Sequence, residues 1–220
     1  MNTDILLVGG DGDLALRKLY PSLYYLTLNG CMPPNTKIFG MARSQREHDD
    51  FVALVHKWLI ENTGSLYDEV VWNKFAPCLH YVQGDSTDPE SLRSIKDQYF
   101  TEESSLIVYL AVPPSIFGKI CTALEAADMS GENTRIVVEK PLGNSKETFL
   151  AIDAEFSRVF KENQIFRIDH YLGKESVQNL LALRFANDIF EPLWNQRNID
   201  HIQITVSETV GVGNRWDFYE

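Results

Sequence analysis

The sequence predicts an α/β fold in which helices wind both faces of a mostly parallel sheet. Three observations lead to this prediction: short apolar stretches of strand length, helical patterns of apolar residues between them, and a glycine-rich loop directly after the first stretch. Strands that alternate with helices are typical of parallel sheets covered on both faces. With 220 residues, 44% of them hydrophobic, the chain is long enough for one large or two small folded domains.

Five apolar stretches in the first 140 residues are predicted strands. They are Asp4–Val8, Lys37–Met41, Cys78–Gln83, Leu106–Ala111 and Arg135–Glu139. Between them, apolar residues recur at helical spacing in two stripes, which are Phe51, Leu54, Val55, Trp58 and Leu59, and Phe149, Ile152, Phe156, Val159 and Phe160. We interpret both stripes as the core-facing sides of helices.

Two helix starts are marked by capping residues. Asn144 and Ser145 stand before Glu147, where a polar side chain can cap the helix that carries the second stripe. Asp88 precedes Pro89, a combination that favours the first turn of another helix.

The character of the chain changes from about Phe166. A polar run, Arg167–Glu175, is followed by a predicted helix over Val177–Phe185, an irregular stretch at Trp194–Asn198 and an alternating strand at His201–Glu208. We therefore place a first domain at residues 1–170 and the beginning of an incomplete α+β domain at 171–220. The last strand has no second strand in the sequence to pair with, so we expect the chain to be part of a longer protein.

Charge and cysteine content narrow the class of protein. The formal net charge of −11 disfavours nucleic acid and anionic membranes as partners. No apolar run is long enough for a membrane span, and the first residues do not resemble a secretion signal, so we expect a cytoplasmic protein. Cys31, Cys78 and Cys121 are widely spaced and odd in number, which indicates neither disulfides nor a zinc site.

The glycine-rich loop predicts a nucleotide site. The strand ending at Val8 continues into Gly10-x-Gly12-x-x-Ala15 and then into a helix, the setting required of a Rossmann-like dinucleotide-binding loop. Backbone and helix N-terminus would approach the pyrophosphate there. The residues that would contact the nucleotide are Gly9, Gly10, Asp11, Gly12, Asp13 and Leu14. A purely structural glycine turn is the alternative, with Asp13 as a helix cap.

The end of the second predicted strand favours NADP over NAD. NAD-binding folds usually carry an acidic residue at this position, whereas here Arg43 and Ser44 follow the strand and Arg46 lies close behind. A cation suits a 2′-phosphate. Asp11 argues in the opposite direction, because a carboxylate near the adenosine ribose would repel that phosphate unless it is turned away. NAD therefore remains possible.

Three motifs together resemble the glucose-6-phosphate dehydrogenase family over nearly the whole chain. They are the glycine loop, the Glu139-Lys140-Pro141 turn after the fifth strand and the nine-residue run Arg167–Glu175. Val112–Ser115, a segment that includes Pro113, is similar to the nicotinamide-side loop of that family. The resemblance implies oxidation of glucose 6-phosphate to 6-phosphogluconolactone with hydride transfer to NADP, at the entry to the pentose phosphate pathway.

The resemblance also implies roles for individual residues. Lys140 would reach the sugar and the nicotinamide, and its bond to Pro141 is often cis in the family. His170, Tyr171 and Lys174 would gather around the sugar phosphate, Glu208 would hold sugar hydroxyls, and Asp169 would support a catalytic base that is a separate, downstream histidine. Independently of the family, Asp169 and His170 are neighbours on an extended strand and should point to opposite faces.

The resemblance predicts poor activity for these residues alone. The stretch Arg215–Glu220 departs from the family pattern at Asp217 and Glu220, and the sequence ends before the family's histidine. We therefore expect little or no turnover. The family's subunits associate through a sheet that would lie downstream, so we expect a homo-oligomer for the longer protein.

Two other functions stay open. Glu-Lys-Pro turns also occur in other sugar oxidoreductases, for which phosphate on the sugar would make no difference to binding. A non-catalytic nucleotide-binding module is the third possibility, and it would bind the cofactor without binding any sugar phosphate.

Overall fold

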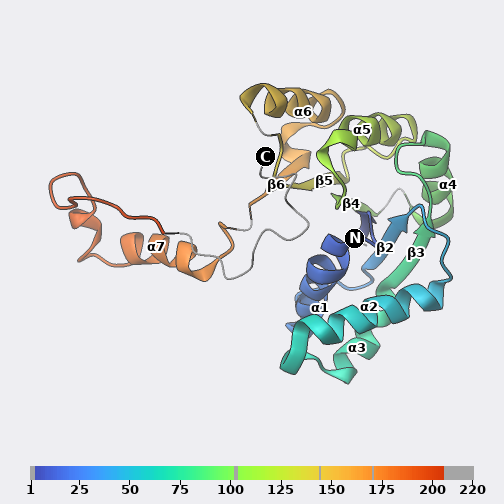
Figure 1. The fold of residues 1–220 in the computed structure, drawn as a ribbon, viewed down its shortest axis with the longest axis horizontal. Coiled ribbons are helices and arrows are strands. Elements are labelled where there is room, and N and C mark those ends of the chain that lie inside the picture. The colour runs from blue at the N-terminus through green and yellow to red at the C-terminus, as the bar shows by residue number, and fades with distance from the viewer. Residues whose placement is uncertain (1–2, 102–103, 144, 170, 206–220) are drawn as a thin grey trace. The chain divides into compact units, whose positions relative to one another are not determined.

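The computed structural model describes residues 3–101, 104–143, 145–169 and 171–205 (Figure 1). The chain divides into two compact units, Met1–Asp169 and His170–Glu220. The first unit contains a parallel sheet with helices on both faces, and the second contains the helix that follows the sheet.

All strands of the first unit belong to one six-stranded sheet with the order β3-β2-β1-β4-β5-β6. Every neighbouring pair is parallel, which confirms the predicted fold class. The strands are β1 (Thr3–Val8), β2 (Lys37–Ala42), β3 (Leu79–Gln83), β4 (Ser105–Leu110), β5 (Thr134–Glu139) and β6 (Ile165–Ile168). The strand order reverses between β1 and β4, and ligands of open α/β sheets bind at such a point.

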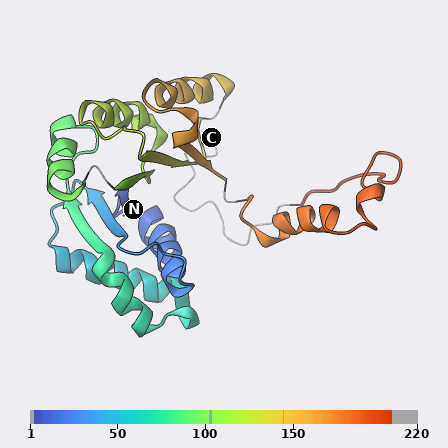
Figure 2. The ribbon, with the colours of Figure 1, turned by 180° about the vertical axis from the view of Figure 1, so that it is seen from behind.

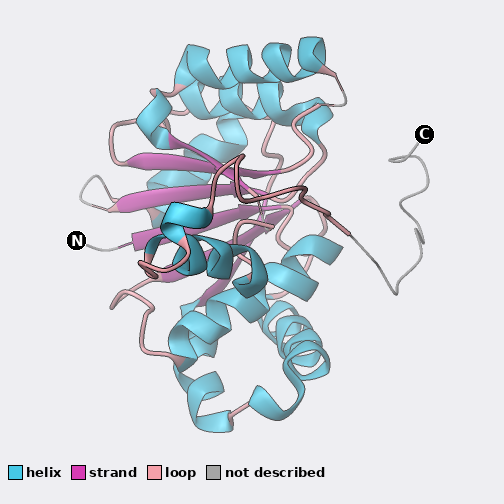
Figure 3. Cartoon of the chain, turned by 90° about the vertical axis from the view of Figure 1, so that its left-hand side faces the viewer, coloured by secondary structure: helices cyan, strands magenta, loops and turns pink. Residues whose placement is uncertain are grey.

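Helices cover the sheet on both sides, as Figures 2 and 3 show. The helices are α1 (Tyr20–Leu28), α2 (His48–Thr63), α3 (Glu69–Phe75), α4 (Pro89–Tyr99), α5 (Phe117–Ala126) and α6 (Lys146–Val159) in the first unit, and α7 (Glu175–Phe185) in the second. Buried side chains of α1, α2 and α3 pack on one face of the sheet. Those of α4, α5 and α6 pack on the other face.

The central strands are apolar on both faces because both faces are covered. In β1, Leu6 and Val8 join the core beneath α4, α5 and α6, whereas Ile5 and Leu7 join the core beneath α1, α2 and α3. These four side chains are at most 8% exposed. A continuous apolar run such as Ile5–Val8 is therefore the expected sequence of a central strand in this fold.

Both predicted helix caps are present. Ser145 caps α6, accepting a hydrogen bond from the backbone N–H of Thr148, whose own hydroxyl accepts from the N–H of Ser145. Asp88 accepts from the backbone N–H groups of Glu90 and Ser91 at the start of α4, with Pro89 in the first turn. Asn144 lies outside the described residues.

The second unit confirms the predicted helix and contradicts the predicted strand. α7 includes the whole of Val177–Phe185. His201 to Thr205 is not a strand, and residues 206–208 lie outside the described part of the chain. The side chains of Ile202 and Ile204 are 72% and 84% exposed. Alternation predicts a strand only where a neighbouring strand can pair with it, and among the described residues none pairs with this segment.

Candidate active site

The predicted site residues of the first unit follow the carboxyl ends of its strands. Because the strands are parallel, these ends meet at one edge of the sheet. Gly9–Leu14 follow β1, Arg43 and Ser44 follow β2, Pro113 follows β4, Lys140 follows β5 and Asp169 follows β6. Residues far apart in sequence are thus brought to the edge beside the β1–β4 reversal.

The glycine loop is held against β2 by its own backbone. The amide groups of Gly9 and Gly10 both donate to the carbonyl oxygen of Met41 at 2.9 Å, and the amide of Gly12 donates to Gly9 at 3.0 Å. Gly9 has φ +83°, a conformation that favours glycine. These three amides are therefore bonded within the protein, so a ligand would have to use other amides of the loop or of the following helix.

Close backbone packing requires the second glycine of the loop. A Cβ atom on Gly10 would lie 2.4 Å from the Cα atom of Gly40 in β2. Across the same contact, the buried phenol of Tyr20 donates a 2.8 Å hydrogen bond to the carbonyl oxygen of Gly10. Burial is the main reason that the pKa of Tyr20 is far above its usual value, with smaller contributions from Asp11 and Tyr81. Tyr20 therefore serves as a neutral donor that fixes the loop.

The chain is helical from Asp13 onward, with π-helical hydrogen bonding at Ala15–Leu19 before α1 begins. The first turn of a helix leaves backbone amides without intrahelical partners, and the helix dipole favours an anion there. The exposed carboxylate of Asp13 lies 3.5 Å from Arg17 one turn later. Leu14 packs against the core beneath α1, so only its backbone is placed to meet a ligand.

Asp11 is linked to the end of β2 through Ser44. The Ser44 hydroxyl donates to Oδ2 of Asp11 at 2.5 Å and lies 2.8 Å from the hydroxyl of Tyr81. Tyr81, from β3, also donates to the backbone oxygen of Ser44. The carboxylate from the loop and the predicted ribose-side residue from β2 therefore form one cluster.

Two arginines stand on either side of Ser44 in the sequence. Arg43 is exposed, and its charge contributes to a lowered pKa of Asp85, which is caused mainly by hydrogen bonds from Thr87. Arg46 is half-buried, and its Nε atom is buried without a hydrogen-bond partner in the described part of the chain. A buried guanidinium N–H that lacks a protein partner suits an anion that would complete its hydrogen bonds.

The loop after β4 lies against the glycine loop. The backbone amide of Ala111 donates to the carbonyl oxygen of Val8 at 2.9 Å. A Cβ on Gly9 would lie only 2.9 Å from Cγ1 of Val112. Pro113 is exposed and precedes the short turn Pro114–Ile116. The predicted nicotinamide-side loop is thus adjacent to the predicted pyrophosphate loop.

The Glu139-Lys140-Pro141 turn connects the ends of three strands. The bond between Lys140 and Pro141 is cis. Glu139 accepts a 2.5 Å hydrogen bond from the phenol of Tyr109 in β4. Burial is the main reason that the pKa of Tyr109 is far above its usual value, and this hydrogen bond adds to it. The ammonium group of Lys140 forms an ion pair with Asp169 after β6. Asp169 therefore orients Lys140.

The nine-residue run divides between the two units. Arg167 lies in β6 and forms ion pairs with Asp153 of α6 at 2.5 Å and with Glu162 at 2.7 Å, so its role is structural. In the second unit, the Lys174 ammonium lies 4.2 Å from the centre of the Tyr171 ring. His170 and Glu208 lie outside the described residues.

Three tyrosines that shape this edge are not marked by any motif in the sequence. Tyr20 fixes Gly10, Tyr81 bonds to Ser44, and Tyr109 bonds to Glu139. Each contact joins residues from separate elements, so no local motif contains it. A tyrosine inside a predicted buried strand or helix, which needs a partner for its hydroxyl, is the one available hint.

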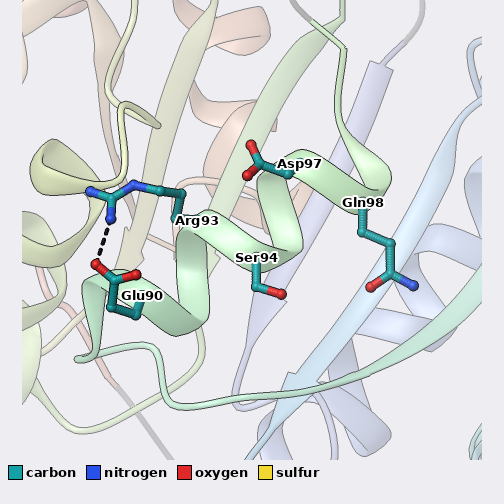
Figure 4. Close-up of a pocket in the computed structure, with 5 residues that line it drawn as sticks. All are labelled: Glu90, Arg93, Ser94, Asp97 and Gln98. Atoms are coloured by element: carbon teal, nitrogen blue, oxygen red, sulfur yellow. Dashed lines mark hydrogen bonds and ion pairs between the residues drawn. The ribbon is translucent and has the colours of Figure 1, made fainter.

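Other features of the described residues lie elsewhere or do not indicate a site. A shallow pocket on the outside of α4 is lined by Glu90, Arg93, Ser94, Asp97 and Gln98, with an ion pair of 2.5 Å between Glu90 and Arg93 (Figure 4). It contains none of the predicted site residues. Within the described ranges, no group of three acidic, histidine or cysteine side chains could hold a metal. No helix there has both the length and the apolar content to cross a bilayer.

Comparison with known proteins identifies the family. The family model for the NAD binding domain of glucose-6-phosphate dehydrogenase matches residues 6–179, and the model for its C-terminal domain matches residues 181–220. The chain belongs to the glucose-6-phosphate dehydrogenase family. This finding confirms the resemblance that the three motifs indicated.

Individual relatives agree with the family models. The chain is 42% identical over 217 residues to the glucose-6-phosphate 1-dehydrogenase of Buchnera aphidicola subsp. Baizongia pistaciae, covering 99% of this chain and 44% of that protein. It is 42% identical over 219 residues to the enzyme of Rhizobium meliloti, covering 99% of this chain and 45% of that protein. The chain thus spans less than half the length of these relatives.

Solved glucose-6-phosphate dehydrogenase structures share the fold. The crystal structure from Mycobacterium avium superposes with a TM-score of 0.85 at 33% identity, over 99% of this chain and 47% of that one. A glucose-6-phosphate dehydrogenase solved in complex with glucose 6-phosphate gives a TM-score of 0.79 at 35% identity, over 89% of this chain and 42% of that one.

Proposed function

We propose that this chain provides the nucleotide site and part of the sugar-phosphate site of an enzyme that oxidises glucose 6-phosphate to 6-phosphogluconolactone with NADP. This is the entry reaction of the pentose phosphate pathway. The observation that carries the proposal is the Lys140–Asp169 ion pair at the sheet edge that also presents the glycine loop. A similar protein of the family was solved with glucose 6-phosphate bound, which supports the substrate.

The nucleotide part of the proposal rests on the loop and on β2. The donor groups fit a dinucleotide: the helix that starts at Asp13 offers first-turn amides to a pyrophosphate, and Arg43 and Arg46 offer cations to a 2′-phosphate. Ser44 would contact the ribose side of the nucleotide, and Pro113 would border its nicotinamide end. The bound nucleotide would accept the hydride.

The sugar part rests on Lys140 and on the second unit. Lys140 would contact the sugar beside the nicotinamide, held in place by Asp169. The cation of Lys174 and the phenol of Tyr171 lie together and suit a phosphate, to which His170 would add a donor and Glu208 would add contacts to the sugar hydroxyls. Oxidation moves one hydride and one proton, and Asp169 would support the base that takes the proton.

The cellular location and the oligomeric state of the enzyme are further parts of this proposal. Glucose 6-phosphate and NADP are charged and do not cross a bilayer unaided, so an enzyme that uses both must share a compartment with them, and we propose that this compartment is the cytoplasm. We propose a homo-oligomer for the longer protein. The exposed side chains of Leu181, Phe185 and Ile189 in the second unit, 62%, 57% and 76% exposed, support further apolar packing in that protein.

The nucleotide part is tested by calorimetric titration of the 220-residue chain with NADP. Arg43→Ala should weaken NADP binding by about tenfold, because it removes one charge-assisted contact to the 2′-phosphate. Arg135→Ala is the matched control, since Arg135 lies near the opposite end of β5 and donates to Ser105. A folded chain that binds no nucleotide would refute the proposal.

The sugar part is tested by titrating glucose 6-phosphate, and separately glucose, into the chain with NADP present. Binding of the phosphorylated sugar alone supports the proposed substrate. Equal binding of glucose would favour another sugar oxidoreductase, because the cation of Lys174 would then have no phosphate to hold. Nucleotide binding without binding of either sugar would favour a non-catalytic nucleotide-binding module.

A further inference from the structure

Asp11 and Ser44 belong to one hydrogen-bonded cluster that also contains Tyr81. The Ser44 hydroxyl lies 2.5 Å from the Asp11 carboxylate and 2.8 Å from the Tyr81 hydroxyl, and Tyr81 also contacts the backbone oxygen of Ser44. Asp11 comes from the loop after β1, Ser44 from the end of β2 and Tyr81 from β3. The three side chains are therefore fixed relative to one another by three adjacent strands.

The hydroxyl protons of Ser44 and Tyr81 are already used in hydrogen bonds within the cluster. The three contacts share only two hydroxyl protons, one from Ser44 and one from Tyr81. An ionised carboxylate accepts and does not donate, so the Ser44 proton is directed to Asp11. The Tyr81 proton is directed to the backbone oxygen of Ser44. Neither hydroxyl has a proton left for a phosphate oxygen, whereas the Asp11 carboxylate keeps further acceptor positions.

This arrangement places a carboxylate beside the end of the second strand. In NAD-binding folds an acidic residue at the end of that strand accepts hydrogen bonds from the ribose hydroxyls. Here the end of β2 provides Arg43 and Ser44, and the hydrogen bond from Ser44 holds the Asp11 carboxylate next to it. A ribose hydroxyl can donate to Asp11, whereas a 2′-phosphate would be repelled by it and attracted by Arg43 and Arg46.

We infer that Asp11 is a selectivity-determining residue that weakens the preference for NADP, so that the site accepts NAD as well. The inference rests on the proposed nucleotide site and adds the residue that tunes its selectivity. Asp11 favours a free hydroxyl at the 2′ position of the ribose, whereas Arg43 and Arg46 favour a phosphate at the same position. The ratio of the two dissociation constants, rather than either constant alone, therefore reports on Asp11.

The experiment is calorimetric titration of the full chain with NAD and with NADP, in the wild type and in Asp11→Asn, Asp11→Thr and Asp97→Asn. Asparagine keeps the shape and an acceptor for Ser44 but removes the charge. Threonine is the second variant in case asparagine perturbs the loop. Asp97 is an exposed carboxylate on the outside of α4 (Figure 4), so its substitution changes net charge equally without touching the nucleotide site.

Both Asp11 variants should shift the ratio of dissociation constants toward NADP by about tenfold, the size expected from removing one charge close to a phosphate in a partly screened site. Asp97→Asn should leave the ratio unchanged. If NADP binds but the ratio stays within about twofold of wild type in both Asp11 variants, the inference is wrong and the proposed site stands. An equal shift in Asp97→Asn would also overturn the inference. If neither nucleotide binds to the folded wild type, both fail.

Discussion

The buried phenol of Tyr20 donates a 2.8 Å hydrogen bond to the carbonyl oxygen of Gly10. Tyr20 is the first residue of α1, and Gly10 lies in the loop that leads into the helix. The helix that receives the chain from the loop therefore also fixes the shape of the loop. Folding of the core and preparation of the nucleotide site depend on the same side chain.

Tyr20→Phe should lower the free energy of unfolding by about 1–2 kcal/mol, because it leaves a buried carbonyl oxygen without its donor. NADP affinity should fall as well, since the loop is less firmly held. Urea unfolding and calorimetry measure the two effects. Tyr25→Phe, on the same helix, is the control, because the described part of the chain gives its hydroxyl no hydrogen bond. Equal effects in both variants would show that the Tyr20 hydrogen bond has no special role.

Gly40→Ala should destabilise the protein by about 1–3 kcal/mol, the usual cost of overfilling a packed core. A Cβ there would lie 2.5 Å from Cζ of Phe51 and 2.5 Å from the Tyr20 hydroxyl. Gly131→Ala is the control, since a Cβ at Gly131 has no atom within 4 Å. Unfolding by urea measures both variants. If the two variants have similar free energies of unfolding, β2 and α2 shift enough to accommodate an extra methyl group.

The fold could be predicted because the central strands carry their signal locally. Ile5–Val8 is apolar on both faces and is followed by glycine, so its pattern alone indicates a buried parallel strand. The segment His201–Thr205 has an equally regular pattern, yet it is not a strand. Strand formation depends on backbone partners that a local pattern cannot supply.

The candidate site could be predicted only in part, for a similar reason. The glycine loop and Lys140 lie in short motifs with recognisable spacing. The partners of Ser44 and Glu139 do not, because Tyr81 and Tyr109 are separated from them in sequence and meet them only through the register of the sheet. The ion pair of Lys140 with Asp169 likewise depends on β5 and β6 being neighbours.

Lys140→Met should change stability by less than about 1 kcal/mol, because the ion pair with Asp169 is exposed on the lysine side. Affinity for glucose 6-phosphate in the presence of NADP should fall by at least about tenfold, since a charge-assisted contact to the sugar is lost. Lys161→Met is the control, because Lys161 forms an exposed ion pair of 2.7 Å with Glu132, and both residues precede the amino-terminal ends of β6 and β5, opposite the proposed site. Unchanged sugar binding in Lys140→Met would remove Lys140 from the proposed site.

The three cysteines should differ in reactivity toward a disulfide reagent such as DTNB. Cys31 is exposed and should react first. Burial raises the pKa of Cys78, and it raises the pKa of Cys121 to about 12, so the thiolate of Cys121 is scarce near neutral pH. Cys31→Ser should abolish the fast phase. A Cys121 that reacts rapidly in the folded chain would contradict the packing beneath α5.

Stability should fall as the pH drops through the usual titration range of histidine, because of His80. The imidazole packs against Phe39, with ring centres 5.0 Å apart, and burial is the main cause of its lowered pKa, followed by the nearby charges of His48 and Lys37. Asp4 acts in the opposite direction.

The sign of this effect follows from proton binding in the two states. The unfolded chain takes up a proton near the ordinary pKa of 6.5, while folded His80 stays neutral to lower pH, so the stability present above that pKa is lost as the pH falls. His80→Phe keeps an aromatic ring against Phe39 and should flatten the pH dependence of the free energy of unfolding between about pH 7.5 and 5.5. Urea unfolding at several pH values measures the slope, and an identical slope in His80→Phe and wild type would show that His80 does not cause it.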